Sequence, residues 1–235
     1  MGARYWELDF ARGFAVVLML AFNWQYALAF FGLTAFNASS GFWWWFARFV
    51  MFLFVFVSGA SMWVSYSRAK SGLFGKFFKR GVFLFSLGVL VTIATYLFVP
   101  KQFVLFGVLH LLALSTVLAF PIAEWGWRKL AVLSLAVVSI GWLIVGATAD
   151  CGCLIWFGLP PTGFQSLDYV PLLPWFGVFL LGLAFSKQAK FSISAPLPAK
   201  PFCFIGRYSL LIYLLHIPFL LAVLYALGKG VYIFG

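Results

Sequence analysis

Residues 42–67 read FWWWFARFVMFLFVFVSGASMWVSYS, and the fold class can be inferred from them. It is apolar along nearly its whole length, and Arg48 is its single charge. A helix needs about 20 mostly apolar residues to cross a bilayer. The tryptophans at 43–45 suit a membrane–water interface, where amphipathic rings lie at the level of the headgroups. The stretch therefore predicts a transmembrane helix.

Six further stretches follow the same pattern, separated by turn signals, basic loops and the helix stops Pro100 and Pro121. The predicted spans are 8–31, 42–67, 77–99, 103–122, 128–147, 170–187 and 204–227. Helices satisfy their own backbone groups in lipid, and the short alternating strands of a membrane barrel are absent from the sequence. We predict an all-α, polytopic membrane helical bundle of about seven transmembrane helices, forming a single transmembrane domain over 1–235. The first stretch is too long for a cleavable signal peptide and is interpreted as a span.

The composition agrees with a membrane location. Hydrophobic residues make up 65% of the chain and charged residues 9%, whereas soluble domains carry about 25% charged residues. The 16 Lys and Arg outnumber the 5 Asp and Glu. Because the basic residues lie between apolar segments, we attribute them to the positive-inside rule and to anionic membrane lipids, not to nucleic acid.

The basic residues also predict an orientation. With a cytoplasmic N-terminus, most of them fall inside or at the inner interface, namely Arg4, Arg12, Arg68, Lys70, Lys76, Lys79, Arg80, Arg128, Lys129, Lys187, Lys190, Lys200 and Arg207. Only Lys101 and Lys229 fall outside. This bias predicts a multi-pass plasma membrane protein with an external C-terminus. The segment 148–169 is then an external loop, long enough to cap a site.

That loop contains two of the three cysteines, Cys151 and Cys153. A disulfide between them would close a very small ring, so we expect two unpaired thiols. Neither these residues nor Cys203 belongs to a Cys/His set with the spacing of a metal site. The sequence predicts no metal.

Polar groups inside a membrane are costly and are functional candidates. At a rise of about 1.5 Å per residue, Asn23, Arg48 and His110 fall in the outer half of their spans, and Asp168 lies just outside the sixth span. We expect these four to converge. His110 can exchange a proton near neutral pH and is a candidate general base, with Asp168 as its orienting partner and Arg48 and Asn23 as substrate contacts.

Structural roles remain open for the same residues. His110 could bond to a backbone carbonyl, Arg48 could form an ion pair or reach the headgroups, and Asn23 could link two helices. A second histidine, His216, lies near the middle of the last span, with Tyr213 three residues before it on the same helical face. We treat His216 as a catalytic candidate and Tyr213 as a substrate-binding candidate, with a packing hydrogen bond as the alternative.

A second polar group is predicted at the inner face. Asp9 and Arg12 are one helical turn apart and can pair. Alternatively Arg12, Arg80 and Arg207 bind the phosphates of a cytoplasmic donor. Since the sequence has no glycine-rich phosphate loop, side chains and helix ends would have to hold that donor.

Five stretches carry a resemblance that spreads over nearly the whole chain. They are 8–19 (LDFARGFAVVLM), 54–59 (FVFVSG), 106–115 (FGVLHLLALS), 168–177 (DYVPLLPWFG) and 206–216 (GRYSLLIYLLH). In this order they resemble the small prokaryotic membrane proteins related to the catalytic domain of heparan-α-glucosaminide N-acetyltransferase. The resemblance implies a transmembrane acyltransferase. In the eukaryotic relatives an acetyl group passes from cytoplasmic acetyl-CoA to a sugar amine on the other side.

The chain departs from those relatives in one respect. They place a proposed catalytic histidine after the first span, but residues 31–41 contain none here. Asn23 also stands where many small prokaryotic members carry histidine. The departure leaves His110 and His216, the two histidines of the chain, as the candidates for proton transfer.

Two functions follow as hypotheses. The first is an acetyl-CoA-dependent acyltransferase that acts on a sugar, glycolipid or other envelope acceptor. The alternative is a non-catalytic carrier or binding module for a lipid or small metabolite. Membrane lipids are expected partners in both, and the sequence leaves open whether a homodimer forms.

Overall fold

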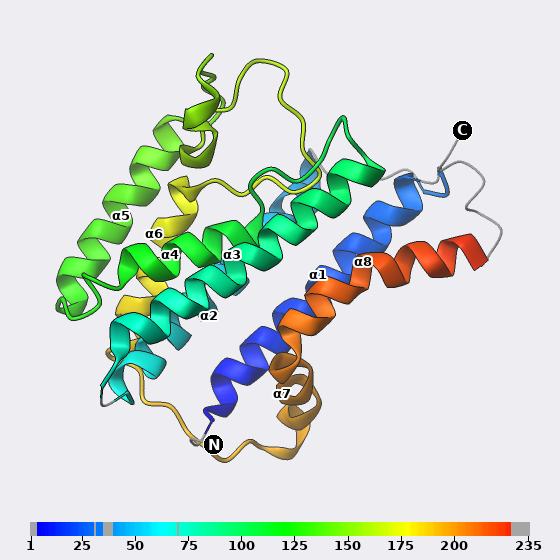
Figure 1. The fold of residues 1–235 in the computed structure, drawn as a ribbon. Helices are drawn as coiled ribbons and strands as arrows, with labels where there is room; N and C mark the ends of the chain where they lie inside the picture. The colour runs from blue at the N-terminus through cyan, green and yellow to red at the C-terminus, as the bar shows by residue number, and fades with distance from the viewer. Residues whose placement is uncertain (1–3, 31, 35–39, 70, 227–235) are drawn as a thin grey trace. The chain divides into compact units, whose positions relative to one another are not determined.

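The computed structural model describes residues 4–30, 32–34, 40–69 and 71–226, and these fold into helices and connecting loops (Figure 1). The α-helices are α1 (Trp6–Phe30), α2 (Gly41–Ser67), α3 (Leu73–Phe98), α4 (Val108–Ala119), α5 (Trp127–Leu143), α6 (Leu172–Ser186), α7 (Lys200–Arg207) and α8 (Ser209–Ala226). Two short 3-10 helices, η1 (Gly152–Phe157) and η2 (Leu197–Ala199), lie in the loops before α6 and α7. The prediction of an all-α fold is confirmed for the described residues.

Each predicted span overlaps a helix, and the largest differences are in the fourth and seventh spans. The fourth helix starts at Val108 instead of residue 103, because the backbone of Gly107 is extended at its N-cap. The seventh span is broken in two: Tyr208 leaves helical geometry, and its N–H bonds to the carbonyl of Ile205 in a tight turn. The helices on either side of this turn form an angle of 71°.

By length and composition, α2 and α3 are able to cross a membrane, and the bent pair of α7 and α8 would be a third crossing among the described residues. The helices α4 and α6 are apolar but shorter. The count of seven spans and the sides of the termini therefore stay predictions.

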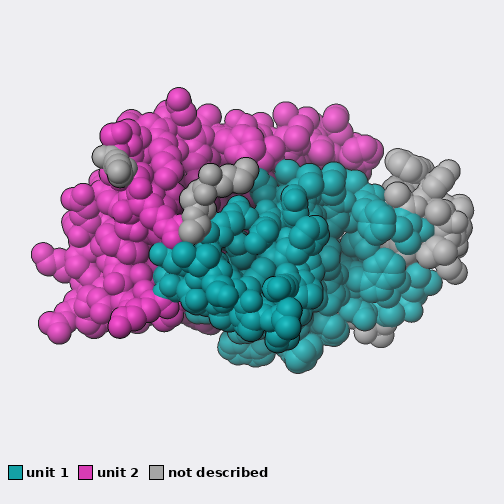
Figure 2. Space-filling view, turned by 90° about the horizontal axis from the view of Figure 1, so that it is seen from below, with its two compact units in different colours: residues 1–54, 191–235 teal, residues 55–190 magenta. Residues whose placement is uncertain are grey.

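The chain forms two compact units, which Figure 2 distinguishes by colour. Unit 1 contains residues 1–54 and 191–235, and unit 2 contains residues 55–190. The boundary lies within α2, so its first half belongs to unit 1 and its second half to unit 2. The prediction of one domain over 1–235 remains untested by this division.

In unit 1, α1 packs against α7 and runs beside α8 (Figure 1). A Cβ atom on Gly13 would lie 1.9 Å from the carbonyl oxygen of Phe202, and one on Gly206 would lie 1.8 Å from that of Asp9. The two backbones are therefore in direct contact, which only glycine permits at these positions. Beyond this crossing Val16, Met19 and Val50 form a buried apolar core.

In unit 2, α3 packs against α4 and α5 against α6. The second half of α2 crosses α6 with the two backbones in direct contact at glycines. A Cβ atom on Gly59 would lie 1.9 Å from the carbonyl oxygen of Phe179, and one on Gly182 would lie 2.0 Å from that of Phe56. The hydroxyl of Ser134 donates to the carbonyl of Gly177 at 2.7 Å across the α5–α6 contact. Small residues at helix crossings are typical of membrane proteins, where close backbone approach replaces hydrophobic burial.

Candidate functional site

The polar pair of Asn23 and His216 lies in unit 1, where α1 and α8 run side by side. The Asn23 amide nitrogen is 3.1 Å from Nε2 of His216, and the His216 side chain is largely enclosed, with the residue 8% exposed. The other ring nitrogen, Nδ1, bonds to the backbone carbonyl of Tyr213. The structure thus joins two residues that the sequence analysis assigned to different groups.

These bonds define the protonation of the His216 ring. A carbonyl oxygen only accepts, so Nδ1 carries the proton and donates to Tyr213. In the neutral ring Nε2 then has a lone pair, which accepts from the Asn23 amide. Tyr213 contributes its backbone carbonyl to this arrangement, and its side chain packs against the apolar core of unit 1, with its ring 5.7 Å from the His216 ring.

An apolar groove of about 580 Å³ opens beside His216. Its lining comes from α1 and α8 and comprises Leu20, Trp24, Leu211, Ile212, Leu215, His216, Phe219 and Leu220. His216 is the one residue of this lining with an ionisable side chain. The groove and the Asn23–His216 pair therefore form one continuous candidate site, and its apolar side chains could not be grouped from sequence because all of the spans are apolar.

His110 lies in unit 2 in a different setting. The residue is 4% exposed, and its ring lies against Phe106 and Phe85, with ring centroids 5.6 and 5.1 Å away. The N–H of Gly107 donates to Nδ1 at 3.3 Å, so Nδ1 is the acceptor and Nε2 carries the proton in the neutral ring. Nε2 lies 2.9 Å from the point that a Cβ atom on Gly88 of α3 would occupy.

Asp168 reaches the same helix start as His110. Its carboxylate oxygen Oδ2 accepts the N–H of Val108 at 3.3 Å, while His110 accepts the preceding N–H, that of Gly107. Acceptors at a helix N-terminus satisfy donors that have no partner within the helix. Both residues therefore bond to adjacent backbone N–H groups at the start of α4. The prediction that Asp168 orients His110 stays a prediction. Their catalytic roles stay predictions.

Arg48 contacts its own helix. Its guanidinium carbon lies 3.4 Å from the centroid of the Trp44 ring, and Nη1 donates to the Trp44 carbonyl at 3.3 Å. A cation over a tryptophan face is a favourable contact. Because Arg48 and Asn23 belong to unit 1 and His110 and Asp168 to unit 2, the convergence of all four stays a prediction.

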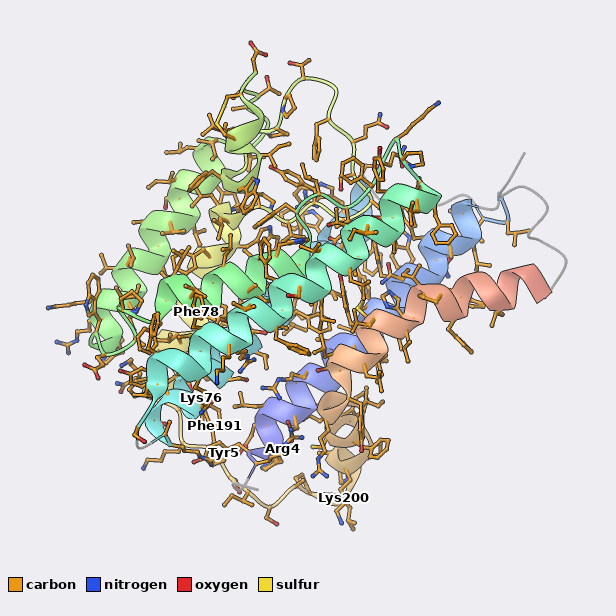
Figure 3. The ribbon with its side chains drawn as sticks, in the orientation of Figure 1. Arg4, Tyr5, Lys76, Phe78, Phe191 and Lys200 are labelled. Carbon is orange, nitrogen blue, oxygen red and sulfur yellow. A yellow bond between two sulfur atoms is a disulfide. The ribbon has the colours of Figure 1, made fainter. Side chains whose placement is uncertain are left out.

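Asp9 is the centre of a charge cluster at the α1–α7 crossing. Its side chain is 5% exposed, and three arginines of unit 1 surround it: Arg12 at 3.2 Å, Arg207 at 3.8 Å and Arg4 at 3.9 Å. Arg4 precedes α1, and Figure 3 labels it there. One carboxylate thus faces three guanidinium groups, so the cluster keeps a net positive charge.

The pairing of Asp9 with Arg12 confirms the prediction from their spacing. Arg207 joins them through the contact of Gly206 with α1, and Arg4 was not predicted as a member. Arg80 is an exposed residue of α3 in unit 2, so the grouping of Arg12, Arg80 and Arg207 around a cofactor stays a prediction. Among the described residues no group of three His, Cys, Asp or Glu side chains is placed to hold a metal ion.

The loop before α6 corrects one expectation. Cys151 and Cys153 form a disulfide instead of two unpaired thiols. Their Cα atoms are 5.3 Å apart, within the usual range for a disulfide, because the chain turns into η1 at this point. The hydroxyl of Tyr169 donates to the Ile155 carbonyl at 2.6 Å and ties the end of the loop to η1. Burial raises the pKa of Tyr169 to about 12.

Comparison with known proteins agrees with the resemblance found in the sequence. The family model described as heparan-alpha-glucosaminide N-acetyltransferase, catalytic, matches residues 4–218. No curated protein matches the chain, and no solved structure does. The matched residues include both histidines, Asp168 and the cluster around Asp9. With two long apolar helices and this match over most of its length, the chain is a membrane protein and belongs to the heparan-α-glucosaminide N-acetyltransferase catalytic family.

Proposed function

We propose that this protein is a membrane-embedded acyltransferase that moves an acetyl group from cytoplasmic acetyl-CoA to an amine or hydroxyl of a sugar, glycolipid or other envelope component. Membership of the family supports the reaction class. The observation that carries the proposal is the state of His216: Nδ1 is held by the Tyr213 carbonyl, and the lone pair of Nε2 is directed at a polar partner beside a groove.

A ring in this state can act as a general base. The acceptor takes the place of the Asn23 amide at Nε2 and gives up its proton as it attacks the thioester carbon of acetyl-CoA. The C–S bond then breaks, and the proton passes from His216 to the CoA thiolate. Asn23, released from Nε2, donates to the oxygen that becomes negative during the attack. His110, with Nδ1 engaged by a backbone N–H, has a structural role in this proposal.

The cluster around Asp9 supplies a site for the donor. Guanidinium groups bind phosphate through charge-assisted hydrogen bonds, and Arg4 and Arg207 are more than half exposed. Asn23 follows Asp9 by 14 residues on α1, a rise of about 21 Å. We therefore infer that the phosphates of acetyl-CoA bind Arg4, Arg12 and Arg207 and that the thioester extends along α1 towards His216.

The same assignment gives the topology that we propose. The cluster at the start of α1 would face the cytoplasm, and the loop with the Cys151–Cys153 disulfide would face the outside, where disulfides persist. The plasma membrane and the seven crossings are part of this proposal.

The experiment that tests the function uses the purified protein in lipid nanodiscs with radiolabelled acetyl-CoA and glucosamine. We expect acetylated amine and free CoA in equal amounts. Arg207→Ala should raise the KM for acetyl-CoA about tenfold, the loss expected for one charge-assisted contact, with little change in kcat. Arg128→Ala, which removes an arginine stacked on Trp127 in unit 2, is the matched control and should leave the KM unchanged.

Two results would contradict the proposal. One is a protein that binds no acetyl-CoA and releases no CoA with any amine or alcohol. The other is a protein that binds and exchanges lipid without acetylating it, which would favour the carrier.

A further inference from the structure

The groove beside His216 determines which acceptors can reach the proposed base. Its volume, about 580 Å³, lies within the range of small-molecule sites, roughly 300–1,000 Å³. Its lining offers the rings of Trp24 and Phe219 and the aliphatic side chains of leucine and isoleucine. Besides the indole N–H of Trp24, the polar side-chain atoms at the site are those of the Asn23–His216 pair.

A free sugar is a poor match for such a site. A polar group that is buried without a hydrogen-bond partner weakens binding, and a sugar has several hydroxyl groups. The Asn23 amide and Nε2 of His216 can serve one or two of them. The groove instead fits a molecule that is mostly hydrocarbon and carries one reactive polar group at its end.

We propose that the acceptor is a chain-bearing lipid, whose alkyl or isoprenoid chain lies in the groove against Leu20, Leu215 and Phe219 and whose terminal amine or hydroxyl meets Nε2 of His216. This inference rests on the proposed function and names its acceptor class. In the reaction the acceptor nitrogen or oxygen forms a bond to the acetyl carbon, and its proton moves to Nε2. The C–S bond breaks, and the thiolate takes that proton to leave as CoA–SH.

The test compares two acceptors that differ in the chain alone, glucosamine and dodecyl β-D-glucosaminide. The protein is held in nanodiscs, because an alkyl glycoside detergent would compete for the groove. We expect kcat/KM to be at least a hundredfold higher for the chain-bearing acceptor, since its methylene groups leave water when the chain enters the groove.

Two variants of α8 form a matched pair. Leu215 lines the groove and is 55% exposed, whereas Ile217 is 44% exposed and lies outside the lining. Leu215→Trp should fill the groove and lower the preference for dodecyl glucosaminide at least tenfold, mainly through KM. Ile217→Trp should leave the preference as it is. Equal kcat/KM for both acceptors, or equal effects of the two variants, would overturn the inference while the proposed acyl transfer stands.

A binding measurement makes the inference independent of turnover. Dodecyl glucosaminide with a diazirine in its chain is photolysed in the nanodiscs, and the labelled peptides are mapped by mass spectrometry. We expect labelling to concentrate on residues 211–220 and to be displaced by unlabelled dodecyl glucosaminide but not by glucosamine. Even labelling of all lipid-facing helices would mean bulk lipid contact and would overturn the inference. Groove labelling without acetylation of either acceptor would instead refute the proposed function and leave a lipid-binding groove.

Discussion

His110 and His216 are both largely enclosed, but their neutral rings carry the proton on opposite nitrogens. In His110 a backbone N–H donates to Nδ1, so the proton lies on Nε2. In His216 a backbone carbonyl accepts from Nδ1, so the lone pair lies on Nε2. The difference comes from position in a helix: His110 is in the first turn, where N–H groups lack partners, and His216 is inside α8, where the nearest backbone group is the carbonyl of Tyr213.

The two histidines therefore have different roles. His110 completes the start of α4 together with Asp168 and packs against aromatic rings and Gly88 of α3. His216 holds a basic nitrogen beside a groove. The lesson is that enclosure of a histidine in a membrane helix does not identify a base, and that the partner of each ring nitrogen has to be known.

The largest expected difference between the two histidines is the effect of removing each ring. His216→Ala should lower kcat by about 10²–10⁴, the contribution of a positioned general base, and added imidazole should restore part of the rate. His110→Ala should keep most of the turnover and lower the unfolding temperature. Acetyl transfer and thermal unfolding are measured on both variants in nanodiscs. The reverse pattern, with turnover lost in folded His110→Ala, would make His110 the base, as the sequence first suggested.

A second test concerns the packing of His110. Gly88→Val should destabilise unit 2 by about 1–3 kcal/mol, because a side chain at this position overlaps the His110 ring. Gly75→Val is the control, since its Cβ atom would meet no neighbour within 4 Å on the same helix. Denaturant unfolding of both variants measures the difference between their free energies of unfolding. Similar stability of the two would show that the His110 ring is free to move.

A smaller effect is expected from the hydrogen-bond partner of His216. Asn23→Ala should reduce kcat/KM about tenfold, since one hydrogen bond to the reacting centre contributes on the order of 1.4 kcal/mol. Gln25→Ala removes a neighbouring amide of α1 that lies outside the groove lining and should have little effect. If Asn23 merely links α1 to α8, its loss will lower stability and leave the kcat of the folded enzyme unchanged.

The smallest effect concerns the loop that carries Asp168. Tyr169→Phe removes the bond to the Ile155 carbonyl and should cost about 1 kcal/mol at pH 8. Because burial raises the pKa of Tyr169 to about 12 in the folded protein, above its ordinary value near 10, the neutral phenol stabilises the fold. That stability is present below about pH 10 and is lost as the pH rises to about 12. The free energy of unfolding of wild type and variant is measured at pH 8 and pH 11. The difference between the two proteins should be smaller at pH 11.

Sequence reasoning found the helices because a long apolar run needs no knowledge of its neighbours. It also found the Asp9–Arg12 pair, which is three residues apart on one helix. It missed the break at Tyr208, because α7 ends where Gly206 contacts the backbone of α1, and a contact between distant segments cannot be read from the local sequence. It missed the Asn23–His216 bond for the same reason: the partners are 193 residues apart, and nothing in either segment specifies the register of α1 against α8.

The glycine crossing of α1 and α7 also limits how the molecule can move. With backbone touching backbone at Gly13 and Gly206, α7 has no room to slide or roll on α1 without separating from it. Tyr208 is the first residue beyond this contact that leaves helical geometry. A movement of α8 that admits or releases a bulky molecule would therefore pivot at Tyr208, directly after Arg207, and would leave the contacts of the arginines with Asp9 in place.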